Sequence, residues 1–334
     1  MKKLSLFHPD IEARHYKALR KRVKRAFVKI EDVVDLNSPR EKAYLRALQR
    51  IGVRGLLIAE PKYLRRVVRC FDGIIPKGDF TNPMSDDYDE RFAEITQRVR
   101  KAFNYEYFCN TSDKNGKWGG WALAKEFNKV LKYCPYCNAE TLYAFEWKKD
   151  ATTLKMAKSA FDHYFPRARY PFLGLSLYNL IPSCTRCNSA FKGAQSKVLT
   201  EMAHPYLDNM DEKMRFHALI VNPGLAFQGD ASGLTDIVLA EREYGMFKAG
   251  ILWSKTFKVS DSYSALYKGD AALALARAKR FPQSYVKMIA GQLKECGLPV
   301  GDLERQLYGM AIDHGQINLY RHGKLICDLV EEYR

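Results

Sequence analysis

The sequence predicts a mainly helical α+β protein with a small zinc-binding core at its centre. Long stretches carry apolar residues at three- and four-residue steps, which indicate amphipathic helices. Shorter β-prone runs predict strands at residues 145–158, 216–221 and 251–259. Two Cys-x-x-Cys pairs near the middle of the chain predict one zinc ion bound by four sulfur atoms.

Composition favours a folded protein with a polyanionic partner. The chain has 334 residues, of which 47% are hydrophobic, enough for two or three domains. Its 54 Lys and Arg against 38 Asp and Glu give a formal net charge of +16, which suits nucleic acid but confers no base specificity. We find no apolar run that would span a bilayer and no signal peptide in residues 1–10, so we expect a cytoplasmic protein without a membrane partner.

Residues 1–72 are expected to form a basic, helical N-terminal region. The first helix is predicted over residues 10–30, where apolar residues recur on one face and Lys or Arg cover the rest. A second basic helix is predicted to follow Ser38-Pro39 and to end near residue 50, and another basic cluster lies beyond Pro61.

The positive face of the first helix has two interpretations of equal weight. Lys21, Arg22 and Arg25 are candidates for binding the phosphates of a nucleic acid. The alternative is a solvated surface helix.

A loop and a helical segment separate the basic region from the core. Residues 72–88 are rich in Gly, Pro, Asn and Asp, which predicts a loop. Over residues 88–130, helices are predicted at 90–107 and 121–131, with a turn-rich stretch at 110–120 between them.

The cysteine pairs frame the core, residues 131–206. Cys134 and Cys137 belong to Cys-Pro-Tyr-Cys, and Cys184 and Cys187 to Cys-Thr-Arg-Cys. Each pair supplies two sulfurs from one tight turn, so the four can surround a structural Zn²⁺ and join the ends of the intervening segment. The other cysteines are isolated in sequence and are expected to be buried thiols: Cys70, Cys109, Cys296 and Cys327.

Residues that suit hydrolytic chemistry lie between and just beyond these pairs. Asp162 and Asn188 offer the oxygen ligands that Mg²⁺ prefers, whereas thiolate sulfur does not suit that ion. His163 can take a proton from water near neutral pH. Each residue alone is more often structural, so the prediction depends on their occurring together.

Several motifs in this order resemble an HNH endonuclease of the ββα-metal class, in the subclass with a four-cysteine zinc. They are Cys-Pro-Tyr-Cys-Asn, Phe-Asp-His-Tyr-Phe-Pro, Asn-Leu-Ile-Pro-Ser-Cys and His-Pro-Tyr. The resemblance implies a β-hairpin that carries Asp162, His163 and Asn179, followed by a helix that carries Asn188 and runs from about residue 184 to 193. It also implies His163 as general base, Asp162 and Asn188 as ligands of catalytic Mg²⁺ or Mn²⁺, and Asn179 as the residue that holds the loop of the base. Histidine is usual in place of Asn188, although asparagine also occurs in the class.

Three basic residues near the motif are candidates for binding the substrate phosphates. Arg167 and Arg169 follow His163, and a guanidinium can hold two phosphate oxygens. Lys192 lies four residues after Asn188, where many members of the class have lysine three residues after. The competing interpretation is that Arg167 and Arg169 are simply solvated in their loop.

The resemblance implies metal-dependent hydrolysis of nucleic-acid phosphodiesters, with DNA as the expected substrate and 5′-phosphate and 3′-hydroxyl ends as products. The length and flanking regions also resemble HNH effectors of bacterial anti-phage systems such as the Septu type, in which the nuclease acts with an ATPase subunit. Two alternatives stay open. One is a catalytically silent zinc-ribbon module that binds nucleic acid or protein, and the other is an RNase of the same fold.

Residues 207–334 are expected to form an α+β packing or interaction region. Beyond the strands at 216–221 and 251–259, helices are predicted at 264–280 and 282–296, the second between Pro282 and Gly297. No motif in this region indicates chemistry.

Overall fold

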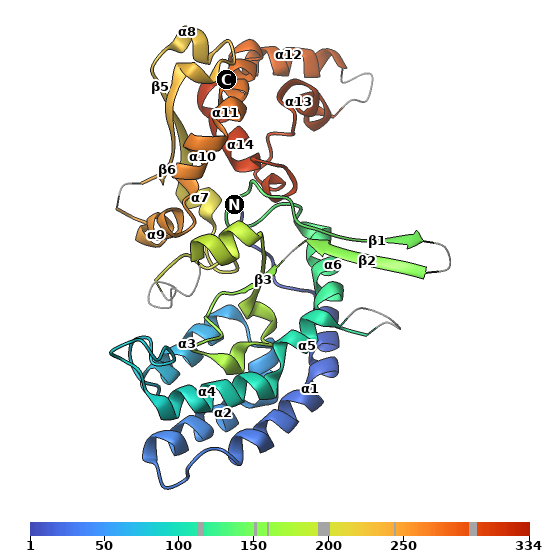
Figure 1. Ribbon diagram of the computed structural model, residues 1–334. Helices are drawn as coiled ribbons and strands as arrows, with labels where there is room; N and C mark the ends of the chain where they lie inside the picture. The colour runs from blue at the N-terminus through green and yellow to red at the C-terminus, as the bar shows by residue number, and fades with distance from the viewer. Residues whose placement is uncertain (112–116, 150–151, 159, 193–200, 244, 294–298) are drawn as a thin grey trace.

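The computed structural model describes the chain except for residues 112–116, 150–151, 159, 193–200, 244 and 294–298. It is an α+β structure with 57% helix. The described strands form three two-stranded antiparallel sheets, β1–β2, β3–β4 and β5–β6. The mainly helical α+β prediction is therefore confirmed. Figure 1 shows a lower lobe of N-terminal helices and an upper lobe from the last third of the chain, with β3 between them.

The lower lobe consists mainly of four helices: α1 (Pro9–Glu31), α2 (Pro39–Ile58), α3 (Pro61–Asp72) and α4 (Glu90–Phe103). The first three have proline in the first turn, where no intrahelical bond is lost. Helix α1 packs against α2 and α4 through the apolar stripe that the sequence predicts. Helix α2 runs on past residue 50 through a kink at Gly52, whose φ of 67° favours glycine.

Two short helices and a hairpin lead into the core: α5 (Tyr105–Asn110), α6 (Gly120–Val130), β1 (Tyr143–Lys149) and β2 (Thr152–Lys158). The helix predicted over residues 90–107 is divided at Asn104, which has a left-handed φ of 50° and caps α5. Gly120 lies so close to the backbone of Cys109 that a Cβ there would be 2.8 Å from it. This contact holds α5 and α6 together beside β3.

The central strands are β3 (Ala160–His163) and β4 (Leu180–Ser183), which pair antiparallel with Asp162 opposite Ile181 and His163 opposite Leu180. Two short 3₁₀ turns, Pro171–Leu173 and Leu177–Asn179, lie on the connection between them. A π-helical segment, η4 (Arg186–Lys192), follows β4. It falls within the helix predicted at residues 184–193.

The upper lobe combines one hairpin with a helical layer. Its elements are α7 (Met210–Lys213), β5 (Met214–Ile220), α8 (Pro223–Ala226), η5 (Ala231–Gly233), β6 (Leu234–Glu241), α9 (Lys248–Thr256), α10 (Val259–Leu266), α11 (Lys268–Arg280), α12 (Gln283–Leu293), α13 (Val300–Tyr308), η7 (Ile317–Leu319) and α14 (Gly323–Tyr333). The strand predicted at residues 251–259 is wrong, because this segment forms most of α9 and the start of α10. Trp253 and Phe257 are four residues apart and both pack on Tyr136, which is helical spacing.

Candidate active site and zinc centre

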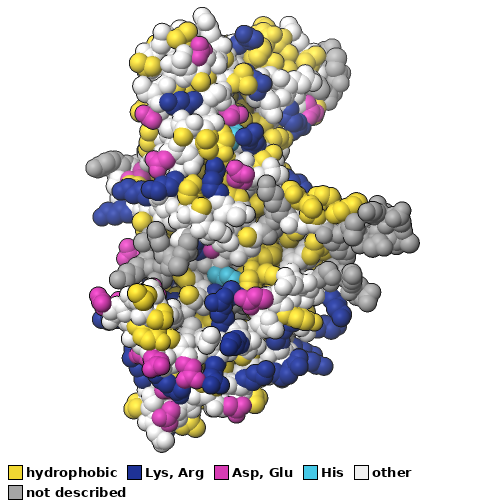
Figure 2. Space-filling model, viewed as in Figure 1, with side chains coloured by type: hydrophobic (Ala, Val, Ile, Leu, Met, Phe, Trp, Pro, Cys, Tyr) yellow, Lys and Arg dark blue, Asp and Glu magenta, His cyan; other side chains and the backbone are white. Residues whose placement is uncertain are grey.

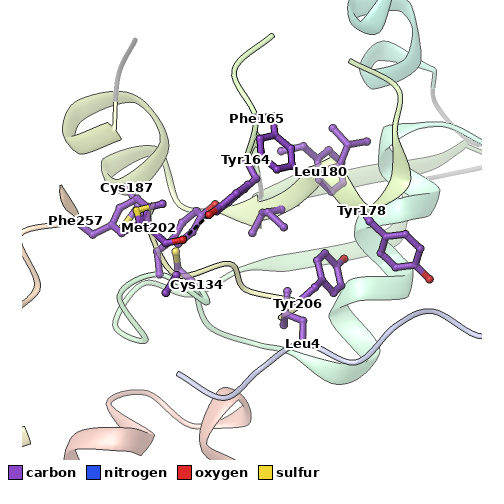
Figure 3. Close-up of a cluster of buried hydrophobic side chains, with 14 of the residues drawn as sticks. Leu4, Cys134, Tyr164, Phe165, Tyr178, Leu180, Cys187, Met202, Tyr206 and Phe257 are labelled. Carbon is purple, nitrogen blue, oxygen red and sulfur yellow. Dashed lines mark hydrogen bonds between the residues drawn. The ribbon is translucent and has the colours of Figure 1, made fainter. Parts of the chain in front are cut away.

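The four paired cysteines converge in the structure. Their sulfur atoms all lie within 4.8 Å of one another, and all four side chains are buried. Around tetrahedral zinc, with Zn–S bonds near 2.3 Å, sulfurs would stand roughly 3.8 Å apart. Backbone N–H groups of Cys184 and Cys187 donate to Cys134 Sγ and Cys184 Sγ, each at 3.4 Å. The cluster could therefore hold a metal such as zinc, and Figure 3 shows Cys134 and Cys187 within the buried core.

Asn138 shapes the first cysteine turn and ties it to the upper lobe. Its N–H donates to Cys134 O at 2.7 Å, and its φ of 54° is left-handed. Its side chain donates to Ile317 O and accepts from the Lys324 N–H, both at 3.0 Å. The cysteine cluster thus fixes the base of α14 as well as the central strands.

Tyr136 joins the cysteine cluster to Asp162. Its hydroxyl donates to Asp162 Oδ2 at 2.5 Å. Its ring stacks on Phe257 with a centroid separation of 4.1 Å, and Trp253 donates its indole N–H to Tyr136 O at 3.1 Å. Tyr136 lies inside Cys-Pro-Tyr-Cys, but no local pattern marks its role, because its partner is 26 residues away.

If Asp162 holds the catalytic cation of a nuclease, as the resemblance implies, Tyr136→Phe is expected to lower cleavage while the fold and any zinc at the cysteine cluster are kept, because the ring packing survives. Loss of a hydrogen bond to a metal-binding carboxylate typically costs roughly 10- to 100-fold in activity or metal affinity. The measurement is cleavage rate against Mg²⁺ concentration, which should shift to higher concentrations. Tyr263→Phe is the matched control, because the Tyr263 hydroxyl bonds Cys137 O instead. Equal shifts in both variants would contradict a specific role for Tyr136.

A pocket of about 750 Å³ opens beside β3. Its lining includes Asp162, His163, Asn188, Arg167 and Lys192, so the structure brings these predicted residues together from β3, the following loop and η4. Helices α4, α5 and α6 supply the opposite wall. Figure 2 shows a histidine in a hollow near the middle of this face, bordered by Lys and Arg side chains.

His163 is held in a defined tautomer. Its Nε2 is 3.1 Å from Gly174 O, and since a carbonyl only accepts, Nε2 carries the proton and Nδ1 keeps its lone pair. Burial lowers the pKa of His163 to about 4, and the nearby charge of Arg167 acts in the same direction. The Tyr105 ring packs edge-on against the imidazole at 4.4 Å. The imidazole is therefore neutral at pH 7 and has one nitrogen available as a proton acceptor.

Asn179 lies outside the pocket lining and secures the loop after β3. Its Oδ1 accepts from the Phe165 N–H at 2.7 Å, and its Nδ2 donates to Phe165 O and Leu173 O, both at 3.1 Å. The side chain is fully buried. These bonds hold the loop from Phe165 to Leu173, which leads to Gly174. The Gly174 carbonyl in turn accepts from His163 and orients its ring.

Asp162 accepts from two internal donors. Lys192 Nζ lies 2.6 Å from both carboxylate oxygens and also donates to His163 O. The Lys192 side chain is only 3% exposed, and burial lowers its pKa. In this structure its ammonium binds Asp162 rather than being presented to a phosphate group.

Asn188 lies on η4, one helical turn after Cys184, the first cysteine of the second pair. Its N–H donates to Cys184 O at 3.0 Å, which places its side chain at the pocket. Within the described part of the chain its amide group has no hydrogen-bond partner. The amide oxygen is thus available to a ligand.

The arginine candidates occupy different places. Arg167 lines the pocket, where it pairs with Glu106 at 2.7 Å and lies 4.7 Å from the centre of the Tyr105 ring. Arg100 of α4, which the sequence analysis missed, also lines the pocket and approaches Glu106 at 3.6 Å. Arg169 instead binds Asp72 and Gly78 O, outside the pocket lining.

The basic face of α1 continues this positive surface. Arg22 and Arg25 border a second hollow of about 380 Å³ with Lys29 and Lys101. The Arg22 guanidinium lies 4.5 Å from the ring centre of Tyr107 on α5. Lys21 is exposed next to them.

Reversing Lys21, Arg22 and Arg25 to glutamate should weaken nucleic-acid binding and flatten its dependence on salt, because fewer counterions are released. Affinity measured from about 50 to about 200 mM salt, a range over which a protein with several phosphate contacts loses orders of magnitude of affinity, tests this. Reversing Lys279, Arg280 and Lys287, exposed on the upper lobe, is a control of equal charge. Unchanged affinity and slope in the α1 variant would mean that this face binds no phosphates.

The isolated cysteines do not all fit the prediction of buried thiols. Cys70 is exposed, because α3 turns Val67, Val68 and Phe71 inward and leaves Cys70 on its outer side. Cys109 is half-buried and lines the pocket, and Cys327 is buried. Cys296 lies outside the described residues.

A second group of possible metal ligands, Asp211, His314 and Asp328, lies in the upper lobe. The ammonium of Lys324 is 3.1 Å from Asp211 Oδ1 and 2.9 Å from Asp328 Oδ2. We interpret the group as a buried ion-pair network that joins α7 to α14.

Comparison with protein-family models, with curated proteins and with solved structures finds no match for this chain. In the described part of the chain, no helix combines the length and the apolar character needed to cross a membrane. The functional conclusion therefore depends on the pocket and the cysteine cluster.

Proposed function

We propose that this protein is a metal-dependent endonuclease of the HNH class that hydrolyses nucleic-acid phosphodiester bonds, with DNA as the expected substrate. The observation that carries the proposal is the convergence of Asp162, His163 and Asn188 on one pocket beside the four-cysteine cluster. If these three side chains had unrelated roles, a carboxylate, a neutral imidazole and an amide oxygen would not need to share one pocket of a basic protein.

His163 would act as the general base. With Nε2–H fixed by Gly174 O, Nδ1 can accept a proton from a water molecule as that water attacks phosphorus. Asn179 supports this role indirectly through the loop that leads to Gly174. Positive charge from Arg167 and Arg100 at the pocket would hold the phosphate oxygens.

Asp162 and Asn188 would hold a divalent cation. After accepting from Lys192, Asp162 Oδ1 keeps one lone pair, while Oδ2 accepts from both Lys192 and Tyr136. One carboxylate oxygen and one amide oxygen at an open pocket suit Mg²⁺ or Mn²⁺, which retain several waters. When bound, the cation would offset charge on the phosphorane and the leaving oxygen.

The cysteine cluster would supply rigidity by binding structural zinc. Zinc would fix Tyr136 on one side of Asp162 and the start of η4, with Asn188, on the other. The two metals would then have separate roles, one in folding and one in catalysis.

Matched DNA and RNA oligonucleotides of one sequence, with and without Mg²⁺ or Mn²⁺, test the proposal. We expect DNA cleavage that requires the metal and leaves 5′-phosphate ends. Cleavage of RNA alone would identify an RNase. Binding without cleavage under every metal would overturn the nuclease proposal.

One observation favours the silent zinc-binding module. The Lys192 ammonium contacts both oxygens of Asp162 and stands where a cation would be needed. If that buried ion pair is permanent, the carboxylate has a structural role only. The same cleavage assay separates the two functions.

A further inference from the structure

A groove of about 660 Å³ is lined by residues of α2 and α3, two helices of the lower lobe (Figure 1). The buried rings of Tyr44 on α2 and Phe71 on α3 meet edge-on, with centroids 5.2 Å apart, and hold the two helices together. Among the described residues, this α2–α3 groove shares no lining residue with the candidate active site. It is therefore a separate surface on a rigid pair of helices.

Most of the lining of the α2–α3 groove is apolar. It includes Leu36, Ala43, Ala47, Ile51, Tyr63 and Val67. The members on α2, and likewise those on α3, recur at four-residue steps, so each helix presents one apolar stripe to the groove. Leu36 and Tyr63 are 56% and 42% exposed, so the structure leaves this apolar surface open to solvent.

Positive charges line the same groove: Lys42, Arg46, Arg50 and Arg66. No acidic residue is among the described lining residues. Within the described part of the chain, none of these four charged groups forms an ion pair or a hydrogen bond. Arg91 in the same lobe, by contrast, pairs with Glu41 at 2.8 Å and with Glu94 at 3.1 Å. The groove therefore carries uncompensated positive charge beside its apolar stripes.

This combination is complementary to an amphipathic helix that has acidic residues along the edges of its apolar face. The lining residues of α2 run from Pro39 to Ile51, which is about 18 Å along the axis and the length of roughly three turns of a partner helix. Nucleic acid fits less well, because its interfaces are more polar, and these aliphatic side chains offer no hydrogen bonds to base edges or sugars.

We propose that the α2–α3 groove binds a partner protein through an acidic amphipathic helix. The apolar residues of that helix would fill the groove, and its Asp or Glu side chains would pair with Arg46, Arg50 and Arg66. The inference does not depend on the proposed nuclease activity, because it uses no residue of the candidate active site.

Selection from a phage-displayed library of random peptides, each of about 16 residues or roughly four helical turns, tests the proposal on the full-length protein. We expect enriched peptides with apolar residues three and four positions apart, flanked by Asp or Glu. Arg46→Glu/Arg50→Glu should weaken the binding of these peptides by about 10-fold or more, because attractive charge contacts become repulsive. Lys279→Glu/Arg280→Glu, exposed on the upper lobe, is the control of equal charge.

A charge swap makes this test specific. A version of an enriched peptide in which Lys replaces each Asp and Glu should bind the Arg46→Glu/Arg50→Glu protein more tightly than it binds wild type. A protein that was merely misfolded by the two substitutions would bind neither version of the peptide, whereas a folded one with a reversed groove charge should prefer the basic version.

Two further measurements locate the peptide without changing the charge of the protein. Leu36→Ser/Tyr63→Ser removes exposed apolar side chains of the groove and should also weaken binding. Leu266→Ser/Leu273→Ser, which removes exposed side chains of the upper lobe, is its control. Cys70 is exposed and lines the groove, so bound peptide should slow its alkylation by N-ethylmaleimide, followed by mass spectrometry.

Failure to enrich any such peptide would overturn the proposal, as would peptides that bind both groove variants as tightly as wild type. If the two variants instead lost affinity for a labelled DNA oligonucleotide, with peptide binding unchanged, the groove would be a nucleic-acid surface. Self-association of the wild type that both variants abolished would assign the groove to a second copy of this chain and would likewise contradict the proposal.

Discussion

Cys134→Ser or Cys187→Ser is expected to unfold the centre of the molecule as well as to abolish activity. Structural zinc can contribute about 10 kcal/mol or more of folding free energy in small domains, comparable to the whole stability of a typical protein. The cysteine turn also positions Tyr136 against Asp162 and Asn138 against α14, so its loss would disturb both lobes.

Elemental analysis, circular dichroism and thermal unfolding of wild type and variants measure this effect. Cys70→Ser is the control, because Cys70 is exposed and distant in sequence from the cluster. We expect one zinc per wild-type chain and per control chain. A protein free of zinc that is nevertheless folded and active would refute the structural role of the cluster.

His163→Ala is expected to lower the rate of cleavage by roughly 10² to 10⁴, the usual contribution of a general acid or base. His163→Gln should be as slow, although its amide can still donate to Gly174 O and preserve the loop. Zinc content, folding and nucleic-acid affinity should stay close to wild type in both variants.

His8→Ala provides the control, because His8 is exposed near the start of α1. Single-turnover cleavage with saturating protein compares the chemical step directly. If His163→Gln cut as fast as wild type, another group would have to be the base.

Local patterns predicted the helices better than the strands. The apolar stripe locates α1 within one residue at each end, and Ser38-Pro39 marks the start of α2. Helix α2 nevertheless runs on to Ile58, past its predicted end near residue 50, and α3 was predicted only as a basic cluster beyond Pro61. The apolar and β-branched residues of segment 251–259 fit the spacing of a helix as well as that of a strand. The packing of Trp253 and Phe257 on Tyr136, four residues apart, favours the helix. Strand β6 was not predicted, since its pairing with β5 is a tertiary contact.

For the candidate site, the motifs that resemble an HNH endonuclease named residues that line one pocket, but Asn179 and Arg169, which they also named, lie outside its lining. Asp162, His163 and Asn188 do line one pocket. The internal ion pair of Lys192 and the hydroxyl of Tyr136 could not be predicted, because each depends on the folding of the core around Asp162. Arg100 reaches the pocket from α4, 62 residues before Asp162, with no motif to mark it.

The most direct test of a hydrolytic pocket is a Mg²⁺ titration of single-turnover cleavage by wild type, Asp162→Ala and His163→Ala. We predict that wild type cuts only with the metal and that Asp162→Ala needs a higher concentration for its residual activity. His163→Ala should be slow at every concentration but should still depend on Mg²⁺, since the cation's electrostatic contribution does not require the imidazole. Variants as fast as wild type at every Mg²⁺ concentration, or a wild type that never cuts, would contradict the assignment of this pocket as a nuclease site.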